Sequence, residues 1–403
     1  MRVSTPLLYD QAVSAMGTQQ SQLLRLQQQI ASGRKLLSAS DDPIAAAQAL
    51  VIRQSQAEND RYAGNIGAAR DLLGQSDSVL ASIINVLQSA RTTAINGGSG
   101  ALSASDRSDL ANAVSKQLDE LVALANTRDG NGNFLYAGFQ NATVPFSGGG
   151  TTPVVYNGDQ GVQTMQVSAT RFVNVTENGT ALFEAIRDGN GTFSVTPNSA
   201  NAGTGVVDAT SVPNPAAVTG DTYALQFRVS GGVTTYDVID VTSNVTVSTG
   251  NAYVPDGSID VAGMRVSIGG APANGDGFTL APSTAQSVFT TLQKLVAVLR
   301  SQPATAAQRA SFTNGLNDAV NNLDQAIQHV LTARADAGAS LQELDALSSS
   351  IADRGVQYQQ TVSRLEDLDY NRALSLFTQQ QVALEAAQKS FIQTSGLSLF
   401  SLL

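Results

Sequence analysis

The chain has 403 residues, enough for about two to four domains, and its acidic residues outnumber the basic ones by 33 to 23, a formal net charge of −10. This balance argues against a nucleic-acid partner, because phosphate groups need a basic surface, and zero cysteines with one histidine leave no disulfide framework and too few ligands for zinc. No apolar stretch is long enough to span a membrane, and the N-terminus lacks the apolar core of a cleaved signal peptide.

A first helix is expected over residues 13–30, where apolar side chains recur at intervals of three and four residues. Gln20 and Gln27 complete this spacing. The apolar members of the face, expected to pack in an assembly, are Val13, Met16, Leu23 and Ile30. Since the segment is rich in glutamine and an isolated helix is marginal in water, we expect residues 1–40 to fold only conditionally.

A second, long helix is expected after residue 42. Asp42 can cap it and Pro43 suits its first position, where a missing N–H costs nothing. The spacing of its apolar residues is that of a coiled coil and uses Ile66, Ala69, Leu73, Leu80, Ile83 and Leu87. The glycine-rich stretch after Asn96 should end it, and Ser105 or Asp106 should open a third helix that runs to about residue 125.

Residues 130–283 are rich in Gly, Thr, Val and Asn and predict β-strands. Three dipeptides suggest hairpin turns, namely Asn157-Gly158, Asn178-Gly179 and Asn190-Gly191. Apolar and polar residues alternate over 223–229, 236–241 and 261–268. The stretch 189–218 is expected to be a loop or boundary between two β modules.

The last third is again rich in Ala, Gln and Leu and predicts one helix from about residue 339 to 395, roughly 85 Å long. Its expected seam consists of Leu341, Leu344, Leu347, Ile351, Tyr358, Val362, Leu365 and Leu368. So long a helix needs partners, and the N-terminal helices are the natural ones. An apolar tail follows that either docks within the chain or is buried by neighbouring copies; it contains Leu397, Leu399, Phe400, Leu402 and Leu403.

These patterns predict an α+β protein, an elongated helical bundle or coiled coil built from both chain ends, with two inserted β-rich modules. The expected domains are a conditionally folded terminal coiled coil (1–42 with 370–403), a helical bundle (43–133 with 284–369), a first β module (134–186) and a second, inserted β module (187–283).

No catalytic, cofactor or metal site is expected. Asp129 begins a stretch like a calcium loop, but Phe134 and Gln140 stand where glycine and glutamate are required, so a tight turn is favoured. His329 has no evident nucleophile or orienting partner. The neighbouring carboxylates Glu366 and Asp367 point in different directions on a helix, which favours a solvated or inter-subunit face over a catalytic pair.

Two separated strings carry a family resemblance. Residues 30–49, IASGRKLLSASDDPIAAAQA, resemble the N-terminal signature of the flagellin superfamily, and residues 363–370, SRLEDLDY, resemble its C-terminal signature. The resemblance covers about 1–185 and 284–403. The start, MRVST, the ending, LSLFSLL, and residues 133–139 are similar to the branch that joins hook to filament. Residues 263–283 resemble β modules of other members of the superfamily.

The resemblance implies a non-enzymatic structural component of the bacterial flagellum. It implies an extracellular location at the hook–filament junction, reached by type III export without a cleaved signal. The implied partners are further copies in a ring, the first hook-associated protein, flagellin, and an export chaperone that binds the C-terminal helix. A divergent filament flagellin is the alternative within the superfamily. A surface adhesin is the alternative of another class, although aromatic residues make up only 5% of the chain.

Overall fold

The structure, a computed structural model, describes residues 5–400, and the side chains among them except those of residues 5, 6, 8 and 394–400. Contacts divide the chain into two compact units, one made of residues up to Asn65 and from Ala346 onward, the other of residues Ile66–Asp345. Helices at both ends of the chain and strands in its middle confirm the α+β class.

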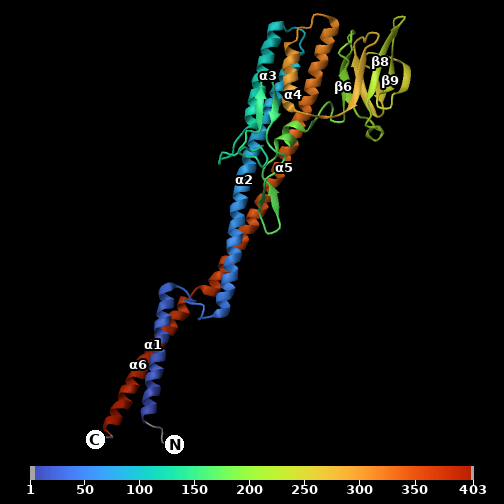
Figure 1. Ribbon diagram of the computed structural model, residues 1–403. Coiled ribbons are helices and arrows are strands. Elements are labelled where there is room, and N and C mark those ends of the chain that lie inside the picture. Colours follow the sequence, from blue (N-terminus) through green and yellow to red (C-terminus); the bar gives the residue numbers. More distant parts are fainter. Residues whose placement is uncertain (1–4, 401–403) are drawn as a thin grey trace. The chain divides into compact units, whose positions relative to one another are not determined.

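The first unit contains the paired helices α1 (Thr5–Ser32) and α6 (Tyr370–Phe400), which run antiparallel so that the start of α1 and the end of α6 lie at the same end of the pair (Figure 1). It also contains the beginning of α2 (Pro43–Gly97) and the end of α5 (Ala306–Glu366). Helix α2 begins at Pro43 and ends in the glycine-rich stretch, as predicted.

The single helix predicted over 339–395 is wrong in both extent and continuity. Helix α5 starts at Ala306, and a break at residues 367–369 separates it from α6. The break has a long-range cause, because the backbone N–H of Leu368 donates to the carbonyl of Gly33 at 3.0 Å and not to its own helix. Asp369 then begins α6 by accepting a hydrogen bond from the N–H of Arg372 at 3.1 Å.

The second unit is built on α2, α3 (Ala104–Ala125), α4 (Val288–Arg300) and α5. All six apolar positions predicted for α2 from Ile66 to Leu87 are buried. Three of them, Leu80, Ile83 and Leu87, pack with α3, α4 and α5 in a core that excludes water. Helix α3 starts slightly earlier than predicted, because Ser103 and Asp106 form a reciprocal capping box.

The first β segment shares this helical core. It consists of the hairpins β1 (Phe146–Gly149) with β2 (Thr152–Tyr156) and β3 (Thr164–Gln166) with β4 (Phe172–Asn174), followed by one π-helical turn η1 (Thr180–Glu184). Phe146, Phe183 and Phe289 of α4 form a cluster with ring centroids 5.0–5.5 Å apart. Burial of these rings holds the segment against the helices.

The second β module has a core of its own. One sheet has the strand order β10-β9-β8-β13-β6 and the other β11-β12-β7. Their bounds are β6 (Phe193–Pro197), β7 (Val206–Ser211), β8 (Tyr223–Ser230), β9 (Val233–Asp240), β10 (Val245–Ala252), β11 (Ser258–Val261), β12 (Met264–Gly269) and β13 (Gly277–Pro282), with a 3₁₀ turn η2 (Pro215–Ala217). The stretch 189–218, predicted as a loop or a boundary between two β modules, contains the two strands β6 and β7.

The chain enters and leaves this module through a short antiparallel ribbon of β5 (Ile186–Arg187) and β14 (Ala285–Gln286), in which Arg187 pairs with Ala285. The side chain of Asp188 closes the ribbon by accepting hydrogen bonds from the N–H and hydroxyl of Thr284. We call this ribbon the neck. The boundaries of the four domains proposed from the sequence stay predictions.

The three Asn-Gly dipeptides do not form hairpin turns. Asn178, for example, accepts a hydrogen bond from the N–H of Ala181 and opens the π-helical turn. Two-residue hairpin loops occur instead at Gly150-Thr151, Gly231-Gly232 and Ala262-Gly263. In the last two, all four residues have positive φ, the geometry that a type I′ turn needs.

Candidate functional site

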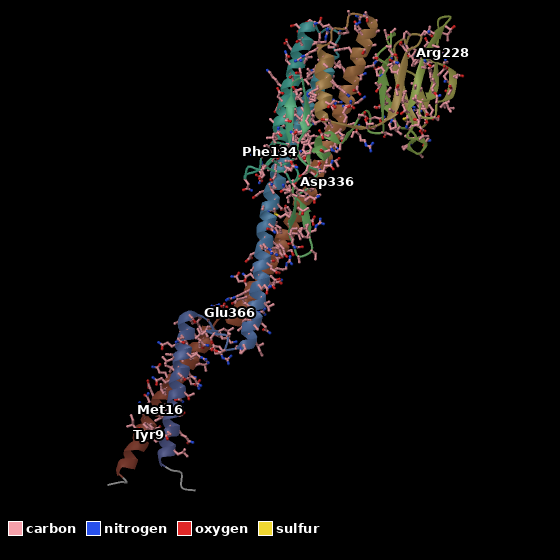
Figure 2. All side chains as sticks on the ribbon, in the orientation of Figure 1. Tyr9, Met16, Phe134, Arg228, Asp336 and Glu366 are labelled. Atoms are coloured by element: carbon pink, nitrogen blue, oxygen red, sulfur yellow. The ribbon has the colours of Figure 1, made fainter. Side chains whose placement is uncertain are left out.

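The helix pair α1/α6 meets along a narrow seam. Half-buried side chains recur at alternating intervals of four and three residues on both helices, the spacing of a coiled coil. On α1 they are Ala12, Met16, Gln19, Leu23, Leu26 and Ile30, and on α6 Phe377, Gln380, Leu384, Ala387 and Phe391, following the buried Ala373. Figure 2 labels Met16 and Tyr9 on α1, and the Tyr9 ring lies 4.8 Å from that of Phe391.

The structure places Met16, Leu23 and Ile30 on this seam, as predicted from the sequence. Val13 departs from the prediction, because it is 46% exposed and Ala12 occupies the seam position beside it. Leu26 likewise takes the place expected for Gln27. A register error of one residue moves a side chain by about 100° around a helix, which explains both shifts.

Little of the pair is truly buried. Among the side chains that the structure describes on α1 and α6, only Ala373 is less than 9% exposed. The side-chain oxygens of Gln19 and Gln380 are enclosed at the seam without a hydrogen-bond partner. Apolar residues instead remain exposed outside it, namely Leu7, Val13, Leu24, Leu374, Leu376 and Val382. The pair leaves apolar surface for something outside the chain to cover.

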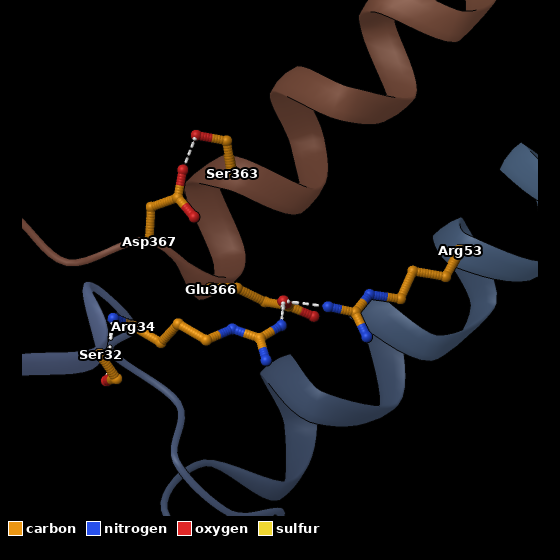
Figure 3. A network of polar contacts seen from close by, with 6 residues as sticks. All are labelled: Ser32, Arg34, Arg53, Ser363, Glu366 and Asp367. Carbon is orange, nitrogen blue, oxygen red and sulfur yellow. Dashed lines mark hydrogen bonds and ion pairs between the residues drawn. The ribbon is translucent and has the colours of Figure 1, made fainter. Parts of the chain in front are cut away.

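A group of ion pairs joins the end of α5 to α2 and to the segment that follows α1. We call this group the clasp. The Glu366 carboxylate accepts hydrogen bonds from the guanidinium groups of Arg34 and Arg53 (Figure 3). Glu366 is 7% exposed, whereas both arginine side chains are about half exposed. The expectation that Glu366 faces solvent or a neighbouring subunit is therefore wrong, because intramolecular ion pairs bury it; Asp367 is exposed as expected.

Backbone hydrogen bonds reinforce the clasp. The N–H of Lys35 donates to the Glu366 carbonyl at 2.7 Å, so with the bond from Leu368 to Gly33 two chain segments run antiparallel as a minimal β-bridge. Gly33 has φ of +69°, and a Cβ there would lie 3.0 Å from the Tyr370 hydroxyl. Glycine is thus needed for both the backbone conformation and the close approach.

The connection between α1 and α2 is held by two aspartates. The N–H groups of Ser38 and Leu37 donate to Asp41 and hold the pKa of its carboxyl below its usual value. Asp42 caps α2 by accepting from the N–H of Ala45 at 3.0 Å, which confirms its predicted role next to Pro43.

The described residues predicted for the C-terminal seam are buried or half-buried, although the single helix predicted for them is divided into α5 and α6. Leu344 and Ile351 are buried, and Tyr358, Leu365 and Leu368 are half-buried, with Leu368 in the break between helices. The side chains of Leu397, Leu399 and Phe400 lie outside the described residues. Arg34 and Arg53 were missed by sequence reasoning, since no local pattern ties them to a glutamate more than 300 positions away.

Asp129 and His329, the other two motifs, bind backbone groups of the chain. Asp129 forms a tight turn by accepting from the N–H groups of Asn131 and Asn133. His329 Nε2 lies 2.8 Å from the carbonyl oxygen of Ala181. Within residues 5–400, no three metal-binding side chains converge on a common point, and no helix is long and apolar enough to cross a bilayer.

Known proteins share both the helical ends and the fold. Residues 3–141 match the bacterial flagellin N-terminal helical region and residues 320–403 the bacterial flagellin C-terminal helical region. Helical ends of this kind around a β-rich middle define a flagellin-type structural protein.

Individual relatives narrow this class. The crystal structure of FlgL from Xanthomonas campestris is 32% identical, covers 77% of this chain and 99% of its own, and has a TM-score of 0.71. Hook-associated protein 3 from Legionella pneumophila is 27% identical over 78% of this chain and 98% of its own, with a TM-score of 0.74. Flagellar hook-associated protein 3 of Salmonella typhimurium is 29% identical over 100% of this chain and 99% of its own. The chain belongs to the flagellar hook-associated protein 3 (FlgL) family.

Proposed function

We propose that this chain is a non-catalytic junction subunit that forms a ring between hook and filament and adapts one helical lattice to the other. The observation that carries the proposal is the α1/α6 pair, whose seam is only half-buried and whose outer apolar residues are exposed. Copies arranged side by side would cover those residues.

The partners follow from the family. One face of the ring contacts the first hook-associated protein and the other contacts flagellin. Before export through the flagellar type III apparatus, which cleaves no signal, a chaperone covers the C-terminal helix. The exposed apolar side chains of Leu374, Leu376 and Val382 on α6 support this role of a chaperone, because they would otherwise face water before assembly.

Deletion of the gene tests the junction role. We expect cells with hooks, no attached filaments and flagellin lost to the medium; normal filaments would refute the proposal. Purified chain added to filament seeds distinguishes the remaining alternative, because a filament flagellin would extend the seeds and a junction subunit would not.

Variants at Leu365 and Leu368 test whether the junction function requires packing within the first unit. Leu365→Asp or Leu368→Asp loses apolar burial of about 2 kcal/mol and adds the cost of desolvating a charge, so motility should be lost. Arg364→Ala, at an exposed position beside the seam, is the control and should swim normally. Normal swimming of the Asp variants, produced at normal levels, would contradict this role.

The second β module should be dispensable for attachment. The neck shows where to cut, because removing only 223–281 would strand β6 and β7 without their partners β13 and β12. Replacing residues 188–284 by Asn-Gly joins Arg187 to Ala285 through a two-residue hairpin. We expect this variant to anchor filaments, and failure despite normal export would refute the assignment.

A further inference from the structure

The free edge of strand β7 is covered by a helix. In the order β11-β12-β7, β7 is the last strand, so the backbone groups on its outer side have no neighbouring strand. Such an edge is a ready template for pairing with another chain, and folded proteins commonly cover or distort it. Here the register of β7 against β12 also shifts between Val207 and Ala209, which makes Asp208 an unpaired extra residue.

Two asparagines of α5 meet this edge with the hydrogen-bond pattern of a strand. Asn314 Oδ1 accepts from the N–H of Val207 at 2.8 Å, and Asn314 Nδ2 donates to the carbonyl of Gly205 at 3.0 Å. One helical turn later, Asn317 Nδ2 donates to the carbonyl of Val207 at 2.9 Å. Both backbone groups of Val207 are therefore bound by side chains of one helix face.

A third asparagine fixes the module close to its neck. Asn322 Oδ1 accepts from the N–H of Gly189 at 2.8 Å. Asn314 and Asn322 are 7% and 3% exposed, so each side-chain amide is buried where an unmet hydrogen bond costs about 1–3 kcal/mol.

We propose that Asn314 and Asn317 stand in for a fourth strand along the free edge of β7, and that this pairing fixes the second β module to α5 so that the two move as one body. A flexible tether at the neck alone would leave the module free to swing, because β5 and β14 pair over only two residues. The asparagine contacts add an anchor more than a hundred positions away from the strand they bind.

Spin labels test this directly, since the chain has no cysteine of its own to remove. Labels are placed at Gln226→Cys on β8 and Gln328→Cys on α5, both exposed. Pulsed electron paramagnetic resonance then gives the distribution of distances between them. We expect a narrow distribution for the parent chain and one broadened about twofold or more by Asn314→Leu with Asn317→Leu, because leucine has the same branched arrangement of side-chain heavy atoms as asparagine but cannot hydrogen-bond.

Asn321→Leu is the matched control, because Asn321 is exposed one turn beyond Asn317 and should leave the distribution narrow. A parent distribution that is already broad, or one equally narrow in the double variant, would overturn the proposal. If circular dichroism shows that the double variant has lost its strands, Asn317→Ala decides the question. It removes one of the three edge hydrogen bonds, and an unchanged width would then overturn the proposal.

Discussion

The terminal helix pair and the second β module differ in how much of their apolar surface they bury within one chain. The module encloses twelve buried apolar residues between two sheets, whereas among its described side chains the α1/α6 pair buries only an alanine. The module can therefore hold its structure within one chain. The pair has the coiled-coil spacing but not the burial, which is what an element completed by other copies requires.

The sharpest test of this contrast is amide hydrogen exchange in the verified monomer. Amides of residues 5–40 and 370–400 should exchange close to the rate of an unfolded chain, while those of Phe227 and Val266 should be slower by about three powers of ten or more. A trace of protease should likewise remove both ends first. Full protection of α1 and α6 in a monomer would contradict the contrast.

The module can be broken without disturbing the helices. Phe227 is fully buried, with its ring 5.2 Å from that of Tyr253 and 5.8 Å from that of Phe278. Phe227→Ala should cost the module about 3–5 kcal/mol, measured by chemical denaturation, because it leaves a cavity. Phe172→Ala, at a ring that is 55% exposed, is the control and should change stability far less.

Replacing one carboxylate oxygen of Glu366 by an amide nitrogen should weaken the clasp. Glu366→Gln keeps the shape but removes the charge that binds Arg34 and Arg53, and should cost about 1.5–3 kcal/mol. We place the effect at the low end of that range because both arginines are half exposed. Faster exchange of the Lys35 amide reports it, and Asp367→Asn, at the exposed neighbour, should leave that amide unchanged.

The pair can also be strengthened. Gln380→Leu with Gln19→Leu removes two enclosed oxygens without partners and extends the apolar seam, which should stabilise the isolated pair by about 1–2 kcal/mol. Circular dichroism of the monomer should show more helix. Gln379→Leu, one position outside the seam, is the control and should not add helix. An equal gain of helix in this control and in the double variant would contradict the assignment of Gln19 and Gln380 to the seam.

The smallest effect is expected from a carboxylate pair in the module. Burial and the neighbouring Asp256 raise the pKa of Asp208, so its charged form is disfavoured in the folded state. Its contribution to stability is complete at acid pH and is lost as the pH rises through the raised pKa. Asp208→Asn should thus stabilise the module at pH 7, by about 0.5 kcal/mol because the pair is largely solvated, and should have no effect near pH 3. Thermal unfolding at the two pH values measures the difference.

Local signals made part of this structure predictable. The buried stripe of α2 and the cap at Asp42 depend on residues a few positions apart, and both were expected from spacing and residue type alone. The same holds for Met16, Leu23 and Ile30 on the seam of α1.

Long-range contacts explain what the sequence could not show. The break between α5 and α6 exists because Gly33 supplies a carbonyl to Leu368, and the burial of Glu366 depends on two distant arginines. The asparagines of α5 resemble an ordinary polar face until β7 is placed beside them. The predicted hairpin turns at Asn178 and Asn190 are wrong because each side chain accepts a hydrogen bond from a backbone N–H three residues later, from Ala181 and Phe193, and so orders a different local turn.

The neck has a consequence for how such a chain can vary between generations. Because Arg187 and Ala285 face one another across two antiparallel strands, the intervening coding segment can be exchanged, enlarged or lost in frame while the helices on either side keep their spacing. Recombination at this point would alter what the protein presents around residues 188–284 and leave the inherited packing of its helices untouched.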